Sequence, residues 1–246
     1  MTTVATDVVL EASGVSAAYG RLPVLFDIDV SVARGNVLAV LGANGAGKTT
    51  LLSVLAGLMP AEQGAIRFCG VDVTDEPAER RIRRGLALVQ GGAAVFPSLT
   101  VAENLRAGCF SLNDRDTGVA GRRAEVLELF PILRDRLPQA AGTLSGGERQ
   151  MLALAKGLLL GGELLCIDEL SLGLAPLVVE QLGDVVQQLR TSGRTMIIVE
   201  QSVSLALRLA DEVMVLERGR VVLQGPTAEL TSDLRQLETA LLGGAA

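Results

Sequence analysis

The most constraining feature of the sequence is a glycine-rich stretch, residues 38–52, that joins two apolar runs. It reads Leu-Ala-Val-Leu-Gly-Ala-Asn-Gly-Ala-Gly-Lys-Thr-Thr-Leu-Leu. The first run predicts a buried strand, the glycines predict a tight loop, and the second run predicts a helix. Glycines let successive backbone N–H groups point inward at an anion, and the N-terminus of the helix adds partial positive charge. The stretch therefore predicts a phosphate-binding loop.

Two side chains in this loop have the chemistry that a bound nucleotide needs. Lys48 would reach the β- and γ-phosphates, and the Thr49 hydroxyl would bind Mg²⁺. The competing interpretation is a glycine-rich turn before an ordinary helix. The chain has only two lysines, so a chance match of the flanking residues to one of them would occur about once in several hundred cases. The residues expected to contact the nucleotide here are Gly42, Ala43, Asn44, Gly45, Ala46, Gly47, Lys48, Thr49 and Thr50.

Length and charge narrow the classes of protein. A chain of 246 residues suffices for one large α/β domain, or for a core with a smaller inserted domain. The net charge of −6 and the lack of a basic run argue against a nucleic-acid-binding surface. Cys69, Cys109 and Cys166 are too far apart for a metal site and predict reduced thiols in a cytosolic protein, with Cys166 in the core. Neither a signal peptide nor a membrane span is expected.

The pattern along the chain predicts alternating strands and helices around a mostly parallel sheet. Strands are expected at 8–15, 24–32, 37–41, 65–68, 86–90, 164–168, 195–200, 212–216 and 221–224. Helices are expected at 48–58, 78–84, 151–160, 176–190 and 202–209 and near the C-terminus. Between 91 and 142 the only predicted elements are helices at 101–107 and 122–130, the second stopped by Pro131. This segment predicts a helical insertion between two strands.

Two adjacent acids, Asp168 and Glu169, end a buried strand. Such acids must be solvated, paired or bound to a metal, so their position favours a functional site. Asp168 is suited to binding Mg²⁺ through water, and Glu169 to polarising a water that attacks phosphorus. Since ligands bind at the carboxyl ends of parallel strands, Gly42, this acidic pair and Glu200-Gln201 are the candidate strand ends.

Two further features allow two interpretations each. Ser145, Gly146 and Gly147 open a helix, so they are either a second anion site or an ordinary N-cap. Tyr19 is the only tyrosine, and its ring is either free to stack on a base or half-buried in the core.

Taken together, these motifs resemble the ATPase subunits of ATP-binding cassette (ABC) transporters nearly from end to end. Residues 42–49 match the family's first phosphate motif, 144–150 its signature motif, and 164–169 its magnesium-and-base motif. The resemblance implies that Tyr19 stacks on adenine and that Gln90 takes part in metal binding and catalysis. It implies a RecA-like phosphate-loop NTPase core at 7–90 and 162–246, with N-terminal antiparallel strands and a helical subdomain at 91–161. ATP and Mg²⁺ are the implied ligands.

Within the family, residues 95–105, 171–176 and 199–201 look like the ATPases of branched-chain amino acid importers, with relatives that serve urea or short amides. This resemblance implies a permease in the membrane, a second ATPase subunit of the same or another kind, and indirectly a periplasmic or lipoprotein solute-binding protein. The expected location is the cytoplasmic face of the membrane. Two subunits would pair head to tail, so that Ser145, Gly146 and Gly147 of one complete the ATP site of the other. Phe96 and Leu99 would contact the permease or, in the competing interpretation, fill the subdomain core.

Three departures from the family pattern keep rival functions open. Gln201 replaces a histidine and can still donate a hydrogen bond to the γ-phosphate as part of catalysis, but it cannot carry charge. Leu170 replaces a proline, and Gly92 and Ala93 stand where the subgroup commonly has arginines. These departures motivate one rival, a nucleotide-binding scaffold with impaired hydrolysis. A second rival is a soluble ABC ATPase that acts as a regulatory switch, since a single cassette with no expected membrane span fits that function as well as transport.

Overall fold

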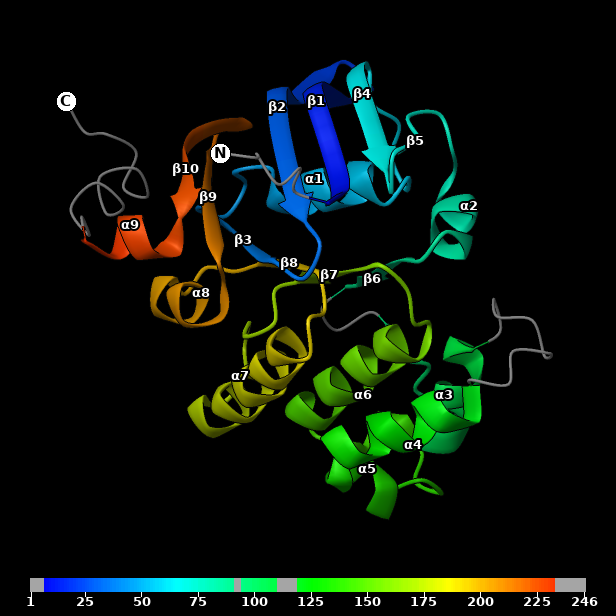
Figure 1. The fold of residues 1–246 in the computed structure, drawn as a ribbon. Helices are drawn as coiled ribbons and strands as arrows, with labels where there is room; N and C mark the ends of the chain where they lie inside the picture. Colours follow the sequence, from blue (N-terminus) through cyan, green and yellow to red (C-terminus); the bar gives the residue numbers. More distant parts are fainter. Residues whose placement is uncertain (1–6, 91–93, 110–118, 233–246) are drawn as a thin grey trace.

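The computed structural model describes residues 7–90, 94–109 and 119–232, which form two sheets and several helices in layers (Figure 1). Helix α1 (Lys48–Leu55) lies between a smaller antiparallel sheet and a central sheet. Helices α3 to α7 lie on the opposite face of the central sheet. The mixed α/β fold that the sequence predicts is confirmed.

The antiparallel sheet has the strand order β2-β1-β4-β5. Its strands are β1 (Val8–Tyr19), β2 (Leu22–Ala33), β4 (Gln63–Phe68) and β5 (Val71–Asp72). The two N-terminal strands are each 12 residues long, which exceeds the prediction, because the turn between them takes only Gly20 and Arg21. Leu22 and Pro23, which precede the predicted strand 24–32, belong to β2.

The central sheet has the strand order β10-β9-β3-β8-β7-β6. Its strands are β3 (Val37–Leu41), β6 (Leu86–Val89), β7 (Leu164–Asp168), β8 (Met196–Val199), β9 (Glu212–Glu217) and β10 (Arg220–Pro226). The pairs from β6 to β9 are parallel, and only the edge strand β10 runs antiparallel to its neighbour. This confirms the mostly parallel sheet.

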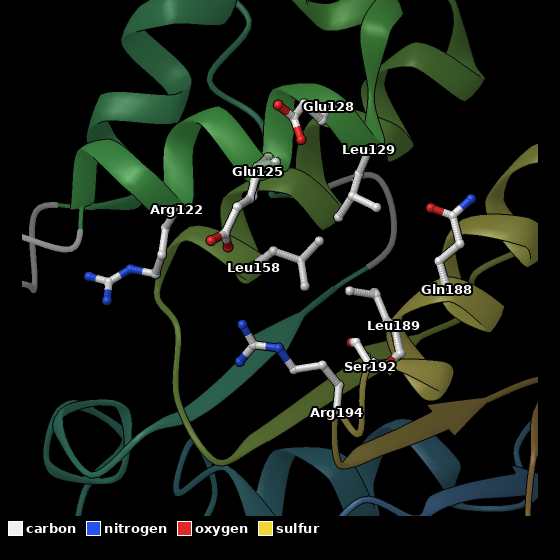
Figure 2. A pocket seen from close by; sticks show the side chains of 10 residues that line it. Arg122, Glu125, Glu128, Leu129, Leu158, Gln188, Leu189, Ser192 and Arg194 are labelled. Atoms are coloured by element: carbon white, nitrogen blue, oxygen red, sulfur yellow. Dashed lines mark hydrogen bonds between the residues drawn. The ribbon is translucent and has the colours of Figure 1, made fainter.

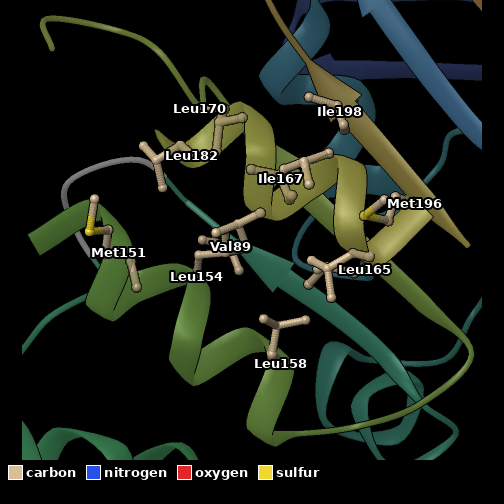
Figure 3. Packing of buried hydrophobic residues seen from close by; sticks show 14 of the residues in the cluster. Val89, Met151, Leu154, Leu158, Leu165, Ile167, Leu170, Leu182, Met196 and Ile198 are labelled. Atoms are coloured by element: carbon tan, nitrogen blue, oxygen red, sulfur yellow. The ribbon is translucent and has the colours of Figure 1, made fainter. Parts of the chain in front are cut away.

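Both faces of the central sheet are covered, which explains why its strands read as continuous apolar runs. In β3, Leu38 and Val40 pack with α1 and the antiparallel sheet. Val37, Ala39 and Leu41 point the other way and join the helical side. Figure 3 shows that second cluster, in which strand side chains meet residues of α6 (Gly146–Leu159) and α7 (Pro176–Thr191). The loops that leave the strands are therefore fixed by a rigid core.

The remaining helices are mostly short. They are α2 (Ala78–Arg83), α3 (Val101–Gly108), α4 (Val119–Leu129), α5 (Pro131–Asp135), α8 (Val203–Leu209) and α9 (Thr227–Ser232), with a 3₁₀ turn at Ala141–Thr143. In the part of the chain that the structure describes, no helix is both long and apolar enough to cross a membrane.

Several predicted boundaries were wrong for local reasons. Helix α1 ends at Leu55 rather than at residue 58, since Gly57 takes the left-handed conformation with φ 74°. Pro131 does not only stop α4 but also begins α5, because proline fits the first turn of a helix. The two-residue strand β5 was not predicted. Of the expected C-terminal helices, α9 is described, and residues after 232 lie outside the described ranges.

The segment between β6 and β7 contains α3 to α6, as expected for a helical insertion. Helix α6 contacts α3, α4 and α5, yet it also packs on β6 and β7. The insertion and one face of the central sheet thus share a single apolar cluster. The division into a core and a subdomain at 91–161 stays a prediction.

The three cysteines are free thiols. Cys166 lies in β7 with no exposed surface, and burial raises the pKa of its thiol to about 12. Its predicted place in the core is confirmed. Cys69 is exposed and Cys109 is half-buried.

Arg81 is a charged residue in the core, with 1% of its surface exposed. Its guanidinium donates to the carbonyl oxygens of Val54 at 2.8 Å and Leu55 at 2.7 Å, at the C-terminal end of α1. Two more bonds reach the carbonyls of Thr74 and Glu76, each at 3.0 Å. Burial lowers the pKa of Arg81, but the four carbonyls accept from four of its five N–H donors.

We expect Arg81→Leu to lower the free energy of unfolding by about 3 kcal/mol, because it leaves four carbonyl oxygens without this donor. Arg80→Leu on the same helix is the matched control, since Arg80 is exposed and should change stability by less than about 0.5 kcal/mol. Urea denaturation followed by circular dichroism measures both. Equal effects of the two substitutions would contradict the prediction.

Candidate functional site

Three neighbouring strands, β3, β8 and β7, end at one edge of the central sheet. Val199 of β8 is aligned with Val40 of β3 on one side and with Asp168 of β7 on the other. The glycine-rich loop, the acidic pair and residues 200–201 therefore leave the sheet side by side. The carboxyl edge of a parallel sheet is where ligands bind in α/β proteins.

The glycine-rich loop depends on backbone conformations that other residues avoid. Gly42 has φ 154°, and a Cβ atom there would lie 2.3 Å from the carbonyl oxygen of Leu216. Gly47 has φ 106° at the N-cap of α1, and a Cβ atom there would lie 2.9 Å from Leu25 Cδ2. The loop can pass this close to β9 and β2 only with glycine at both positions. Its tip, residues 43–45, is exposed.

Lys48 begins α1 and is 4% exposed. Its Nζ atom donates to the carbonyl oxygens of Gly42 at 2.8 Å and Ala43 at 3.0 Å, so the ammonium group points back into the loop. Burial lowers the pKa of this ammonium, and three nearby carboxylates oppose that shift. The carboxylates belong to Glu169, Asp168 and Glu200. A cation held in the curl of an anion-binding loop is suited to bind phosphate.

Thr49 and Asp168 bring two oxygen ligands together across the cleft. The Thr49 hydroxyl donates to Asp168 Oδ1 at 3.3 Å. Asp168 is 7% exposed, and its pKa is raised, mainly by burial. Among the described residues no cluster of three or more acids, histidines or cysteines could hold a metal by itself. Mg²⁺ commonly binds through one or two protein oxygens with water and phosphate, so this donor pair fits it.

Glu169 follows β7 in a strained conformation, with φ 52°. For a residue other than glycine this left-handed conformation costs about 1–2 kcal/mol, so neighbouring contacts must hold it. Its backbone N–H donates to the carbonyl oxygen of Val199 at 3.1 Å, and its Oε1 accepts a hydrogen bond from Gln201 Nε2, also at 3.1 Å. The structure thus places Gln201 directly against the carboxylate proposed to act on water.

Glu200 is the residue of this site to which sequence reasoning gave no role. It is 1% exposed, and its carboxylate accepts hydrogen bonds from the backbone N–H of Ser171 at 3.0 Å and from the Ser171 hydroxyl at 2.7 Å. Burial raises the pKa of Glu200, and these hydrogen bonds partly oppose the shift. The signal was an acid directly after the apolar run 196–199, the same pattern that singled out Asp168.

A cleft of about 490 Å³ opens at this edge of the sheet. It is lined by Thr49, Gln90, Gly146, Arg149, Gln150, Asp168, Glu169, Leu172, Gly173 and Leu174. Gln90, exposed after β6, therefore faces the same space as the acidic pair. The cleft adjoins an anion-binding loop and contains a hydroxyl and two carboxylates, a combination that suits phosphoryl transfer to water.

The serine-glycine motif begins α6, and its serine has an ordinary structural use. The Ser145 hydroxyl accepts from the N–H of Glu148 at 3.3 Å, and the Glu148 carboxylate accepts from the N–H of Ser145 at 2.8 Å. This is a capping box. Gly147 is buried, and a Cβ atom there would lie 2.4 Å from Val178 Cγ1, so α7 packs directly against this position. Ser145 and Gly146 are exposed at the helix N-terminus, so the cap leaves them accessible to a ligand.

Tyr19 is 57% exposed, so it is not a core residue. Its hydroxyl lies 3.5 Å from the Thr50 hydroxyl of α1. Phe96 is 51% exposed and Leu99 is half-buried, so Phe96 does not fill the subdomain core. Gly92 and Ala93 lie outside the described residues.

Figure 2 shows the lining of a second pocket, of about 400 Å³. It is lined by residues of α4, the end of α6 and the end of α7, together with Arg194. None of the sequence-predicted residues lines it. The candidate site is therefore the cleft at the carboxyl edge.

The comparisons with known proteins all point to the same family. The sequence model described as ABC transporter matches residues 25–171. The chain is 44% identical to the high-affinity branched-chain amino acid transport ATP-binding protein BraG of Pseudomonas aeruginosa, over 94% of this chain and 97% of that protein. It is 37% identical to the probable branched-chain amino acid transport ATP-binding protein LivF of Archaeoglobus fulgidus, over 87% of this chain and 91% of that protein.

Solved structures agree. The structure of an ATP-binding subunit of an ABC transporter has a TM-score of 0.83 at 28% identity and covers 97% of this chain and 100% of its own. The ADP conformation of MJ1267, an ATP-binding cassette, also has a TM-score of 0.83, at 23% identity, and covers 96% of this chain and 99% of its own. The second likeness concerns the fold alone.

We expect Gly42→Ala to lower the free energy of unfolding by about 2–4 kcal/mol, because it adds a collision with Leu216 to backbone strain. Gly45→Ala is the matched control: Gly45 also has positive φ, at 79°, but a Cβ atom there would meet nothing within 4 Å. Its cost should be about 1 kcal/mol. Urea denaturation compares them, and a control as damaging as Gly42→Ala would show that the close approach to β9 is unimportant.

Proposed function

Since the chain belongs to the ABC transporter family, as an ATPase subunit, we propose that ATP hydrolysis in its central cleft drives uptake of branched-chain amino acids through a membrane permease. The observation that carries the proposal is the meeting of Lys48, Thr49, Asp168 and Glu169 at one edge of the sheet. The two branched-chain relatives support the class of solute.

Lys48 and the loop bind the triphosphate in this proposal. The backbone N–H groups of residues 43–48 and the ammonium of Lys48 neutralise the β- and γ-phosphates, and the exposed loop tip leaves room for them. Tyr19 stacks on the adenine, which is consistent with its exposure beside α1.

Thr49, Asp168 and Gln90 would hold Mg²⁺, because all three present oxygen atoms to the cleft. When bound, the ion neutralises phosphate charge that develops during the reaction. Burial raises the pKa of Asp168, and the Thr49 hydrogen bond and Lys48 oppose that shift, so the carboxylate is stabilised in its charged form by the same residues that contact the nucleotide.

In the proposed reaction, Glu169 polarises the attacking water, and Gln201 orients the Glu169 carboxylate. The contact between Gln201 Nε2 and Glu169 Oε1 at 3.1 Å supports this pairing. An amide can donate to the carboxylate or to the γ-phosphate without carrying charge. Leu170, which replaces the family's proline, is fully buried in the core cluster, so it anchors the strand end as an apolar residue. These contacts argue against a scaffold with impaired hydrolysis.

A second ATPase subunit completes each site in the proposed assembly, with Ser145, Gly146 and Gly147 facing the γ-phosphate across the interface. The exposure of Ser145 and Gly146 at the N-terminus of α6 supports this role. Residues 91–161 act as the helical subdomain, and the exposed Phe96 offers an apolar contact for the permease. The subunit then works at the cytoplasmic face of the membrane, with a solute-binding protein delivering the amino acid outside.

Lys48→Ala should abolish ATP hydrolysis and weaken ATP binding, because the phosphates lose their main positive charge. Lys156→Ala removes the chain's other lysine and should hydrolyse ATP normally as the isolated subunit. In proteoliposomes with the cognate permease and binding protein, the parental subunit should support ATP-dependent leucine uptake and Lys48→Ala should not. Hydrolysis without any associated permease or uptake would instead indicate a soluble switch.

Glu169→Gln should bind ATP and fail to hydrolyse it, because the amide cannot polarise water. Intact ATP should then hold two subunits together, and light scattering should show a dimer with ATP but a monomer with ADP. Adding Ser145→Arg should restore the monomer by obstructing the interface. Two results for Glu169→Gln would refute the two-site mechanism. The first is hydrolysis at the parental rate, and the second is a monomer in the presence of ATP, both alone and with the cognate membrane complex.

A further inference from the structure

The Glu200 carboxylate connects the end of β8 to the loop that follows β7 through hydrogen bonds. Oε1 accepts the Ser171 N–H at 3.0 Å, and Oε2 accepts the Ser171 hydroxyl at 2.7 Å and the N–H of Gln201 at 3.2 Å. The backbone N–H of Ser202 also acts on this carboxylate. Glu200 is 1% exposed, so water does not replace these bonds.

The groups that contact the Glu200 carboxylate favour its ionised form, against the effect of burial. All of them are donors: three backbone N–H groups and one hydroxyl. A carboxylate offers acceptors only, whereas an amide would turn its NH₂ group toward at least one N–H group. An amide side chain of the same size therefore cannot reproduce the arrangement.

The loop that Glu200 binds begins with Glu169, the residue in the strained conformation. Glu169 has φ 52°, and Ser171 lies two positions later. Successive residues of the β8 end hold this turn: Val199 accepts the Glu169 N–H, Glu200 binds Ser171, and Gln201 donates to the Glu169 carboxylate. Among these three residues, only Glu200 is hydrogen-bonded to the described part of the loop after Glu169.

We propose that Glu200 is a positioning residue for ATP hydrolysis: its bonds to Ser171 hold the turn that aims the Glu169 carboxylate into the cleft. This inference rests on the proposed role of Glu169 in polarising water. Displacing a reacting group by about 1 Å can cost up to about a hundredfold in rate.

The effect should fall on kcat rather than on ATP binding. Glu200 is not part of the phosphate loop and does not line the cleft. Its backbone N–H donates to the carbonyl oxygen of Val40 in β3 at 3.1 Å. A side-chain substitution leaves that bond in place. Its charge acts on Lys48, but less than the charges of Glu169 and Asp168 do.

The test is steady-state ATP hydrolysis by the purified full chain with Mg²⁺, comparing Glu200→Gln with Ser202→Ala. Ser202 is the matched control, because its hydroxyl caps α8 at the same strand end without touching the 169–171 loop. We expect Glu200→Gln to lower kcat about tenfold or more with KM for ATP within about threefold of parental. Ser202→Ala should keep the parental kcat.

Three results for Glu200→Gln would overturn the proposal. They are a parental kcat, a loss of kcat no larger than that of Ser202→Ala, and a rise in KM at unchanged kcat. Circular dichroism checks the fold. If Glu200→Gln does not fold, Ser171→Ala decides: it removes only the hydroxyl bond and should lower kcat about threefold, and parental turnover overturns the proposal. Failure of the proposed function is a separate result, because it would show as normal hydrolysis in Glu169→Gln.

Discussion

The rest of the site depends on the interactions that compensate the buried positive charge of Lys48. A charge that is 4% exposed is costly unless partners compensate for it. Two loop carbonyls accept its hydrogen bonds, and three carboxylates at or just after the ends of β7 and β8 stabilise its charge. None of these carboxylates is near Lys48 in sequence. The strand order, with β8 between β3 and β7, is what gathers them around one cation.

The same carboxylates carry a cost of their own. Burial raises the pKa of both Asp168 and Glu200, and donors or cations beside each carboxylate oppose that shift by favouring its ionised form. Asp168 has Thr49 and Lys48, while Glu200 has the N–H groups of the adjoining turns. The acids therefore divide into one that faces the cleft and one that faces the backbone. In the proposed mechanism the first binds the metal and the second supports Glu169, a division of roles that follows from their different partners.

Much of this architecture could be predicted from the sequence, because the elements that matter are strongly patterned. The apolar runs of β3, β7 and β8 and the glycines at 42–47 have few alternative structures, so the predicted ends of these strands and the loop between β3 and α1 agree with the structure within a residue or two. Tertiary contacts decided the rest. The end of α1 depends on the left-handed Gly57, and the role of Glu200 depends on Ser171, 29 positions away. No local pattern reports such a pairing.

The cleft also has an open side that residues 7–90, 94–109 and 119–232 do not cover. Leu172 lines it and is 59% exposed, and Leu177, at the start of α7, is 66% exposed, although apolar surface costs about 25 cal/mol per Å² when left in water. Ser145 and Gly146 are exposed there too, at the N-terminus of a long helix with its partial positive charge. Lys48 alone only partly neutralises a triphosphate. If a second subunit covers those leucines, its own helix N-terminus supplies the missing positive charge, so that association and chemistry would each depend on the other.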